Sequence, residues 1–214
     1  MSLFTTFLIQ NGLPEYAITW LFMLPIAITI VVISRQIIGI KGFGIAIPLL
    51  IGLAYTATGI QAGIIIFLAA LGFGLIVRWS LRNTRLLYLP KIALILTGVT
   101  VGTLFLTPFL PYREGLQFPQ AVFAFLILIL SVEQFASLLI ERGVRKTAGM
   151  ALETLLISSA IFFVVTWPWL QTAVLTWPLF VLIAIVLINL GLGKWTGLRF
   201  SEYIRFKDII FKFK

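Results

Sequence analysis

Glu133 is the residue best placed to do chemistry inside a membrane, because it is an acid within a long apolar run. It lies seven residues before Ile140, so it is roughly 10 Å from the end of its predicted helix. A charged group near the middle of a bilayer costs about 2.5–3.5 kcal/mol, so the carboxyl group needs a cationic partner or a proton. Arg35 and Arg78, at the inner ends of other predicted helices, are the candidate partners. We therefore predict that Glu133 is either a proton or ligand site or half of a structural ion pair.

Arg78, Arg82 and Arg85 form a basic stripe, since their spacing places them on one face of a helix that continues past the membrane. Such a stripe suits a lipid head group or an acidic partner surface. It is also the ordinary signal that keeps a loop in the cytoplasm. The sequence leaves both interpretations open.

Three other features carry charge near the predicted membrane surface. Glu141 and Arg142 begin a basic loop, where local pairing is the simpler expectation. Glu153 lies shallower than Glu133, so we expect it to be hydrated or paired with a basic loop residue, in a structural role. Residues 194–214 mix aromatic, aliphatic and basic side chains, a composition typical of an amphipathic helix lying on the inner leaflet.

The composition excludes most catalytic chemistry. There is no Cys, so the chain has no disulfide, thiolate nucleophile or iron–sulfur cluster, and no His, so it has no imidazole base. Asp208 is the only Asp, which excludes a pair of intramembrane aspartates. The sequence contains no phosphate-binding P-loop or dinucleotide-binding glycine motif that follows a strand. We therefore predict no enzyme activity and no cofactor.

The elements that position these residues are predicted to be transmembrane helices. Of 214 residues, 61% are hydrophobic and 11% are charged, against about 45–50% and about 25% in soluble domains. Apolar runs of about 20 residues are needed to cross the hydrocarbon core. We predict an all-α polytopic membrane protein, a single seven-helix bundle with spans at about 14–34, 43–58, 61–79, 89–110, 119–140, 148–167 and 177–193.

In a soluble protein, a net charge of +9 would suggest a nucleic-acid partner. Here the positions of the basic residues instead indicate how the chain is oriented in the membrane. Sorted by loop, 15 basic residues fall on one side of the membrane and only Arg113 falls on the other. The positive-inside rule then places the N-terminus outside and the C-terminus in the cytoplasm, as an odd number of spans requires. We expect a multi-pass protein of the bacterial inner membrane, with anionic lipids at its inner face and no nucleic-acid partner.

Aromatic residues, glycines and a proline complete the predicted bundle. Trp and Tyr fall at the predicted helix ends, and Tyr55 is placed at the outer interface, where its hydroxyl would meet water. Small residues on the second and third spans predict close approach of those two helices. Pro48 is expected to kink the second span, and the chain between Trp167 and Pro178 is expected to be a turn.

The sequence resembles a bacterial family of seven-helix membrane domains that are usually fused to an inactive transglutaminase-like domain. The resemblance covers nearly the whole chain. Its motifs are, in chain order, Arg35-Gln-Ile-Ile-Gly39-Ile-Lys41, Arg78, Arg85-Leu-Leu-Tyr-Leu-Pro90-Lys91, Glu133, Glu141-Arg142-Gly143, and Gly193-Lys194-Trp195-Thr196-Gly197 followed by Arg199, Glu202 and Arg205-Phe206.

The resemblance implies a membrane partner role. In this family the fused domain precedes the helices and lies outside the cytoplasm, and members are associated with ATP-grasp peptide ligases and aspartic peptidases. Residues 1–13 are too short for a transglutaminase-like domain, so we expect such a partner to be a separate polypeptide. A peptide-modification or envelope-associated system is implied.

Two functions from different classes remain open, with an intramembrane enzyme as a remote third. The chain is either a non-enzymatic scaffold that anchors a transglutaminase-like or ATP-grasp partner, or a small transporter or substrate-binding subunit that uses Glu133. The sequence leaves the oligomeric state open. The residues we predict to be functional or partner-binding are Glu133, Arg35, Arg78, Arg82, Arg85, Glu141, Arg142, Lys194, Arg199 and Glu202.

Overall fold

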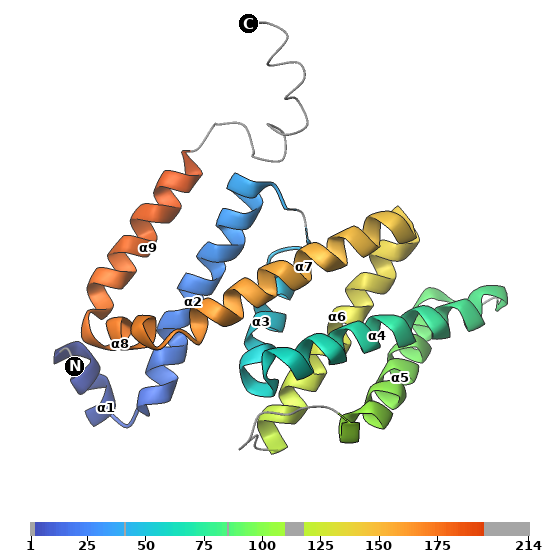
Figure 1. Cartoon of the computed structure of the whole chain (residues 1–214), viewed down its shortest axis with the longest axis horizontal. Coiled ribbons are helices and arrows are strands. Elements are labelled where there is room, and N and C mark those ends of the chain that lie inside the picture. Colours follow the sequence, from blue (N-terminus) through green and yellow to red (C-terminus); the bar gives the residue numbers. More distant parts are fainter. Residues whose placement is uncertain (1–2, 41, 85, 110–117, 195–214) are drawn as a thin grey trace, which may run out of the picture. The chain divides into compact units, whose positions relative to one another are not determined.

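A computed structural model describes residues 3–40, 42–84, 86–109 and 118–194, and the regular structure in them is entirely helical (Figure 1). The predicted all-α class is confirmed. The main helices are α1 (Leu3–Gln10), α2 (Glu15–Ile33), α3 (Ala46–Thr58), α4 (Ile60–Ser80), α5 (Tyr88–Leu106), α6 (Phe118–Arg142), α7 (Val144–Val165), α8 (Pro168–Thr176) and α9 (Pro178–Gly193).

Most of these helices are suited to a bilayer, where every backbone polar group must be bonded within its own segment. Among the described residues, five helices are long and apolar enough to span, namely α2 with its extension to Ile38, α4, α5, α6 and α7. The pair α8 and α9, bent by 108°, makes a sixth candidate, and α3 is a shorter apolar helix. The chain is therefore a multi-pass membrane protein.

The chain divides into two compact units. Unit 1 combines the two ends of the chain, Met1–Lys41 and Phe163–Lys214, and unit 2 is the middle, Gly42–Phe162. Unit 1 thus contains α1, α2, α8 and α9, and unit 2 contains α3 to α6 and most of α7.

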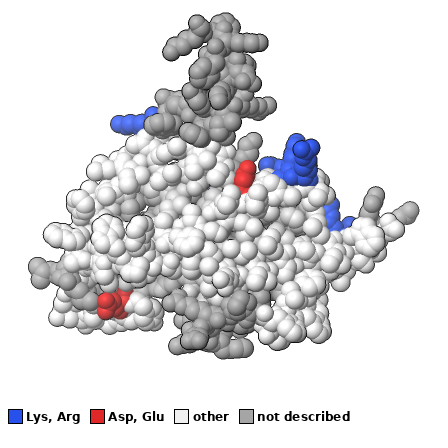
Figure 2. Space-filling view, in the orientation of Figure 1, with Lys and Arg blue, Asp and Glu red and all other residues white. Residues whose placement is uncertain are grey.

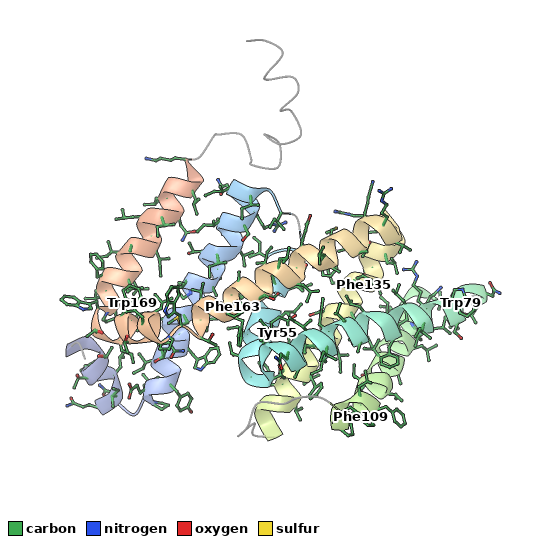
Figure 3. All side chains as sticks on the ribbon, viewed as in Figure 1. Tyr55, Trp79, Phe109, Phe135, Phe163 and Trp169 are labelled. Atoms are coloured by element: carbon green, nitrogen blue, oxygen red, sulfur yellow. The ribbon has the colours of Figure 1, made fainter. Side chains whose placement is uncertain are left out.

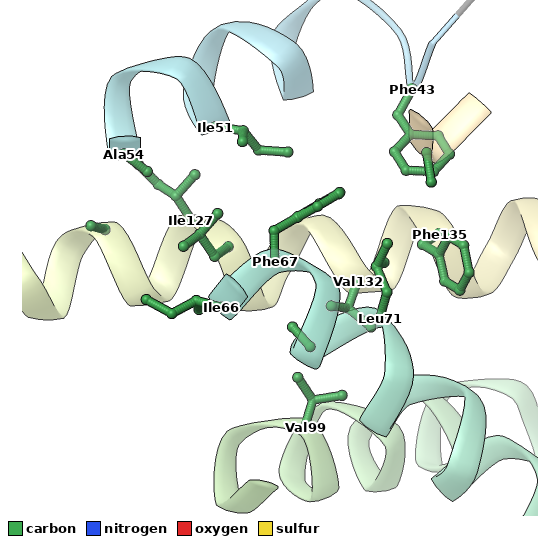
Figure 4. Packing of buried hydrophobic residues seen from close by; sticks show 14 of the residues in the cluster. Phe43, Ile51, Ala54, Ile66, Phe67, Leu71, Val99, Ile127, Val132 and Phe135 are labelled. Atoms are coloured by element: carbon green, nitrogen blue, oxygen red, sulfur yellow. The ribbon is translucent and has the colours of Figure 1, made fainter. Parts of the chain in front are cut away.

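Unit 2 is built on α6, against which α3, α4 and α5 pack, and α4 also packs along α5. Its core is a continuous apolar cluster that includes Phe67 of α4, Val99 of α5 and Leu128 of α6, all fully buried (Figure 4). Phe43, just before α3, meets Phe135 of α6 edge to face, with ring centroids 6.0 Å apart. Such a cluster fixes the relative positions of the helix ends that carry charge.

Glycines on the helices of unit 2 are packing positions, and one of them, Gly63, meets the neighbouring helix that was predicted. A Cβ on Gly63 of α4 would lie 2.3 Å from the Tyr55 ring of α3, so these two helices do approach closely there. Gly52 of α3 instead packs on Ile161 of α7, and Gly74 of α4 packs on Val132 of α6. A periodic pattern identifies the buried face of a helix but not the neighbour that covers it.

Unit 1 places the first and last long helices side by side. The Asn189 side-chain amide of α9 donates to the Thr29 hydroxyl of α2 over 2.8 Å, and the Gln36 amide donates to the carbonyl of Leu192. The second of these contacts lies closer to the C-terminal end than the first on both helices, so α2 and α9 run in the same direction.

Two helix boundaries differ from the prediction. Arg35 does not end the first span, because the helix continues as a short π-helical segment, Ser34–Ile38, and stops at Gly39 with φ of +88°. The predicted turn at residues 167–178 is the helix α8, since Pro168 and Pro178 each occupy a first helical position, where a missing N–H is tolerated.

Pro48 and Tyr55 also correct the sequence interpretation. Pro48 is in the first turn of α3 and so does not kink it, because that turn has no intrahelical acceptor for its N–H. Tyr55 is fully buried in the core of unit 2, where its hydroxyl has no hydrogen-bond partner among the described residues (Figure 3). The expectation that it faces interfacial water is wrong, since α4 and Gly63 cover it.

Candidate functional site

The basic helix ends of unit 2 meet at one pocket. It has a volume of about 350 Å³ and is lined by Leu75, Arg78 and Trp79 of α4, Lys91 of α5, Leu139 of α6 and Val144 of α7. These residues come together because α4 and α6 end where α5 and α7 begin. Trp79 lies at the end of α4 and is largely exposed (Figure 3). The pocket is therefore cationic and apolar at once.

Arg78 is held in place by the backbone of α6. Its Nη1 donates to the carbonyl oxygen of Ala136 over 3.2 Å, and its side chain is half-buried. No carboxylate among the described residues lies within ion-pair distance of the guanidinium group. An Arg side chain carries five N–H donors, so this arrangement leaves a fixed cation with unused donors facing the pocket.

Lys91 is a site residue that the sequence did not single out as functional. It was only part of the Arg85–Lys91 family motif and one of the basic residues that set the topology. Arg78 and Lys91 share no helical face, and they meet because α4 and α5 pack antiparallel, with Gly98 against Val77. A contact of this kind depends on tertiary packing, so no local spacing rule indicates it.

Glu133 lies on the outward face of α6 and is exposed within unit 2. Its carboxylate is not within ion-pair distance of Arg78, which reaches the carbonyl of Ala136 instead, about one helical turn further along. Glu133 lines neither of the pockets described in the molecule. Arg35 is half-buried in the π-helical segment of unit 1.

The other predicted residues fall around helix ends or outside the described ranges. Glu141 and Arg142 are exposed at the end of α6, and Arg142 Nη1 lies 3.6 Å from the sulfur of Met150. Lys194 is exposed at the end of α9. Arg82 is placed by its backbone in a short 3₁₀ turn, Leu81–Asn83. The residues outside the described part of the chain are Arg85, Arg199, Glu202 and the predicted amphipathic segment 195–214.

Charge gathers at the end of unit 2 where α6 turns into α7. Figure 2 shows Lys and Arg atoms clustered there, on a face whose other described residues are almost all uncharged. Arg142, Arg145 and Lys146 are exposed at this turn, which passes through Gly143 with φ of +77°. Val144 of the same turn lines the pocket, so this basic cluster and the Arg78–Lys91 pocket occupy one end of the unit.

Glu153 has a structural contact among the described residues, with the chain just before α3. Its Oε2 accepts a hydrogen bond from the backbone N–H of Gly42 over 2.8 Å, and the neighbouring Thr154 hydroxyl accepts from the N–H of Phe43 over 2.9 Å. One turn on, the Ser158 hydroxyl donates to the carbonyl of Pro48 over 3.0 Å. These hydrogen bonds attach the polar face of α7 to the start of α3 and to the residues just before it.

A second pocket, of about 600 Å³, lies in unit 1 between the start of α2 and α8. Glu15, Tyr16 and Trp20 line it on the α2 side, and Gln171 and Thr172 line it on the α8 side. No group of three or more His, Cys, Asp or Glu side chains that suits a metal ion gathers among the described residues.

The sequence matches a family model described as seven transmembrane helices usually fused to an inactive transglutaminase, over residues 7–210. The chain belongs to this family. The resemblance stated from the sequence motifs is therefore confirmed. No curated protein and no solved structure matches the chain. Membership identifies the chain as a seven-helix membrane domain of a kind that is usually fused to an inactive transglutaminase.

Proposed function

We propose that the chain is a non-enzymatic anchor in the bacterial inner membrane, part of a peptide-modification or envelope-associated system. It holds a transglutaminase-like partner at its outer face and an ATP-grasp partner, docked through acidic groups, at its cytoplasmic face. Family membership supports the first contact, because members are usually fused to an inactive transglutaminase. The basic helix ends support the second.

The observation that carries this proposal is the gathering of basic residues at one end of each unit. In unit 2 this end carries Arg78, Lys91 and the basic α6–α7 turn. In unit 1, Arg35 and Lys194 share an end, because Gln36 bonds the carbonyl of Leu192. A one-sided basic surface both orients a membrane protein and attracts an acidic partner.

The helix directions within each unit agree with alternating spans. Within unit 2, α4 is antiparallel to α5, because Gly98 contacts Val77 and Gly102 contacts Phe73. It is parallel to α6, because Gly74 contacts Val132 and Arg78 bonds the carbonyl of Ala136. In unit 1, α2 and α9 are parallel. These directions are those expected of spans one, three, four, five and seven in an alternating chain, with α3 and α7 as spans two and six.

Topology is tested by single cysteines, since the chain has none of its own. Tyr16→Cys is expected to react with a membrane-impermeant maleimide in intact spheroplasts. Arg145→Cys is expected to react only after the cytoplasmic face is opened. Both residues are exposed, so unequal labelling reports the side of the membrane and not burial. The reverse pattern would reject the orientation and with it the assignment of partners to faces.

The anchor function is tested by affinity purification of the full chain from native membranes in mild detergent, followed by quantitative mass spectrometry. A transglutaminase-like protein or a peptide ligase at near-stoichiometric amount is the expected result. The variant Arg142→Glu/Arg145→Glu reverses charge at the exposed turn and should release the cytoplasmic partner while keeping the outer one. Recovery of the chain alone would overturn the anchor function.

The transporter alternative requires Glu133 in a translocation path. No observation favours it, because Glu133 faces outward on α6 and lines neither described pocket. Proton-coupled uptake in vesicles that is lost in Glu133→Gln would replace the anchor proposal.

A further inference from the structure

The half-buried cation at the end of α4 needs a counter-charge that the described residues do not supply. Arg78 bonds a neutral carbonyl, and it shares its pocket with a second cation, Lys91. Two like charges at the edge of an apolar core are unfavourable unless an anion lies between them. The pocket is therefore built to receive a negative group.

The donors in the pocket favour a phosphate-type oxyanion. A guanidinium group presents a planar fork of N–H donors, which matches two oxygens of a phosphate, and an ammonium group adds a point charge. The bond from Arg78 to Ala136 fixes the guanidinium group before any ligand arrives. Such fixed donors lower the entropic cost of binding.

The walls of the pocket indicate that the phosphate belongs to a lipid. Leu75, Leu139 and Val144 supply apolar surface beside the two cations. Trp79, which is 76% exposed, stands at the rim, as Trp does where hydrocarbon meets head groups. The volume of about 350 Å³ accommodates a head group but is small for a larger ligand.

We propose that the Arg78–Lys91 pocket binds the phosphate of an anionic phospholipid, with the acyl chains of the lipid against the apolar wall. This site is distinct from the exposed turn at Arg142 and Arg145, and it does not depend on the anchor function. A lipid bound there bridges α4, α5 and α6 at one membrane interface. The chain thus binds an anionic phospholipid at a specific site, in addition to lying in the bilayer.

The test is native mass spectrometry of the full chain in mild detergent, titrated with dioleoyl phosphatidylglycerol or dioleoyl phosphatidylcholine. We expect one phosphatidylglycerol to bind at least tenfold more tightly than one phosphatidylcholine, because choline brings a positive charge to a cationic site. In Arg78→Gln/Lys91→Gln the affinity for phosphatidylglycerol should fall about thirtyfold, and in Lys91→Gln alone about fivefold.

Lys194→Gln is the matched control, since it removes one exposed charge from a helix end in unit 1. It should leave the phosphatidylglycerol affinity unchanged. Water-soluble glycerol phosphate serves as the second arm, and it should bind at least a hundredfold more weakly than the lipid.

Three results would overturn the inference: equal affinity for the two lipids, an equal loss in Lys194→Gln, or glycerol phosphate that binds as tightly as the lipid. If the double variant fails to fold, Lys91→Gln and the comparison of the two lipids on the unchanged chain still decide the question. None of these measurements involves a protein partner, so their failure is separate from failure of the anchor function.

Discussion

Adding one methyl group at Gly63 is expected to destabilise unit 2, because α3 and α4 touch at this position. A Cβ there would lie 2.3 Å and 2.8 Å from two carbons of the Tyr55 ring, and 3.1 Å from the Thr58 hydroxyl. Ordinary contact begins at 3.4 Å, so the ring must retreat by about 1 Å.

The ring has little room to retreat. Tyr55 is fully buried, and Gly63 itself is buried at the hairpin that turns through Gly59. Overpacking of a filled core costs about 1–3 kcal/mol. We expect Gly63→Ala to lie in the upper half of that range, since the clashing atoms belong to a rigid ring rather than to a flexible chain end.

Gly72→Ala is the matched control. It adds the same methyl group to the same helix, but apart from its two chain neighbours and the adjacent backbone of α4, nothing lies within 4 Å of the new position. Its effect should be within about 0.5 kcal/mol of zero, as for substitutions away from packed features. The free energy of unfolding of both variants is measured by denaturant titration in mixed micelles, followed by circular dichroism.

The double variant Tyr55→Leu/Gly63→Ala separates a clash from a general loss of helix packing. Without the ring, the alanine at position 63 should cost little stability. The change in the free energy of unfolding of the double variant should therefore differ from the sum of the two single changes by about 1 kcal/mol or more. Equal stability of Gly63→Ala and Gly72→Ala would refute the packing described for α3 and α4.

Four more substitutions test three local features by the same unfolding assay. Tyr55→Phe should not destabilise the protein, because the hydroxyl is buried without a partner among the described residues, and a loss above about 1 kcal/mol would reveal one elsewhere. Ser158→Ala should cost about 1 kcal/mol by removing the bond to the Pro48 carbonyl, and an unchanged stability would contradict that bond. Asn189→Leu and Thr29→Val should couple by about 0.6 kcal/mol, the average for hydrogen bonds between transmembrane helices, and additive effects would refute their contact.

Helix identity could be predicted from the sequence because the bilayer allows few alternatives. An uncharged run such as 42–77 is too long for one span, and in the structure the chain turns at Gly59, whose φ of +87° suits glycine. Hydropathy indicates whether a segment prefers the bilayer to water, and this preference depends only on the residues of that segment.

The contacts between helices could not be predicted in the same way. The bond from Arg78 to Ala136 and the shared pocket with Lys91 depend on which helices pack together. Tyr55 looked interfacial because it is near a predicted helix end, yet a neighbouring helix covers it. Pro168 is a local signal for the start of α8, because proline is common at the first position of a helix. Hydropathy alone, however, does not distinguish a short helix from an apolar loop.

The pairing of α2 with α9 has a consequence for biosynthesis. Thr29 and Asn189 are 160 residues apart, so α2 enters the membrane long before its partner is made. At about 5–20 residues per second, ribosomes take roughly 8–32 s to supply the missing helix. During that interval the middle of the chain can complete its own core, while the first helix waits without its final neighbour. Nascent chains arrested before Asn189 should therefore contain a protease-resistant unit 2 and an α2 without its α9 neighbour, which chaperones or membrane proteases would recognise as incompletely assembled.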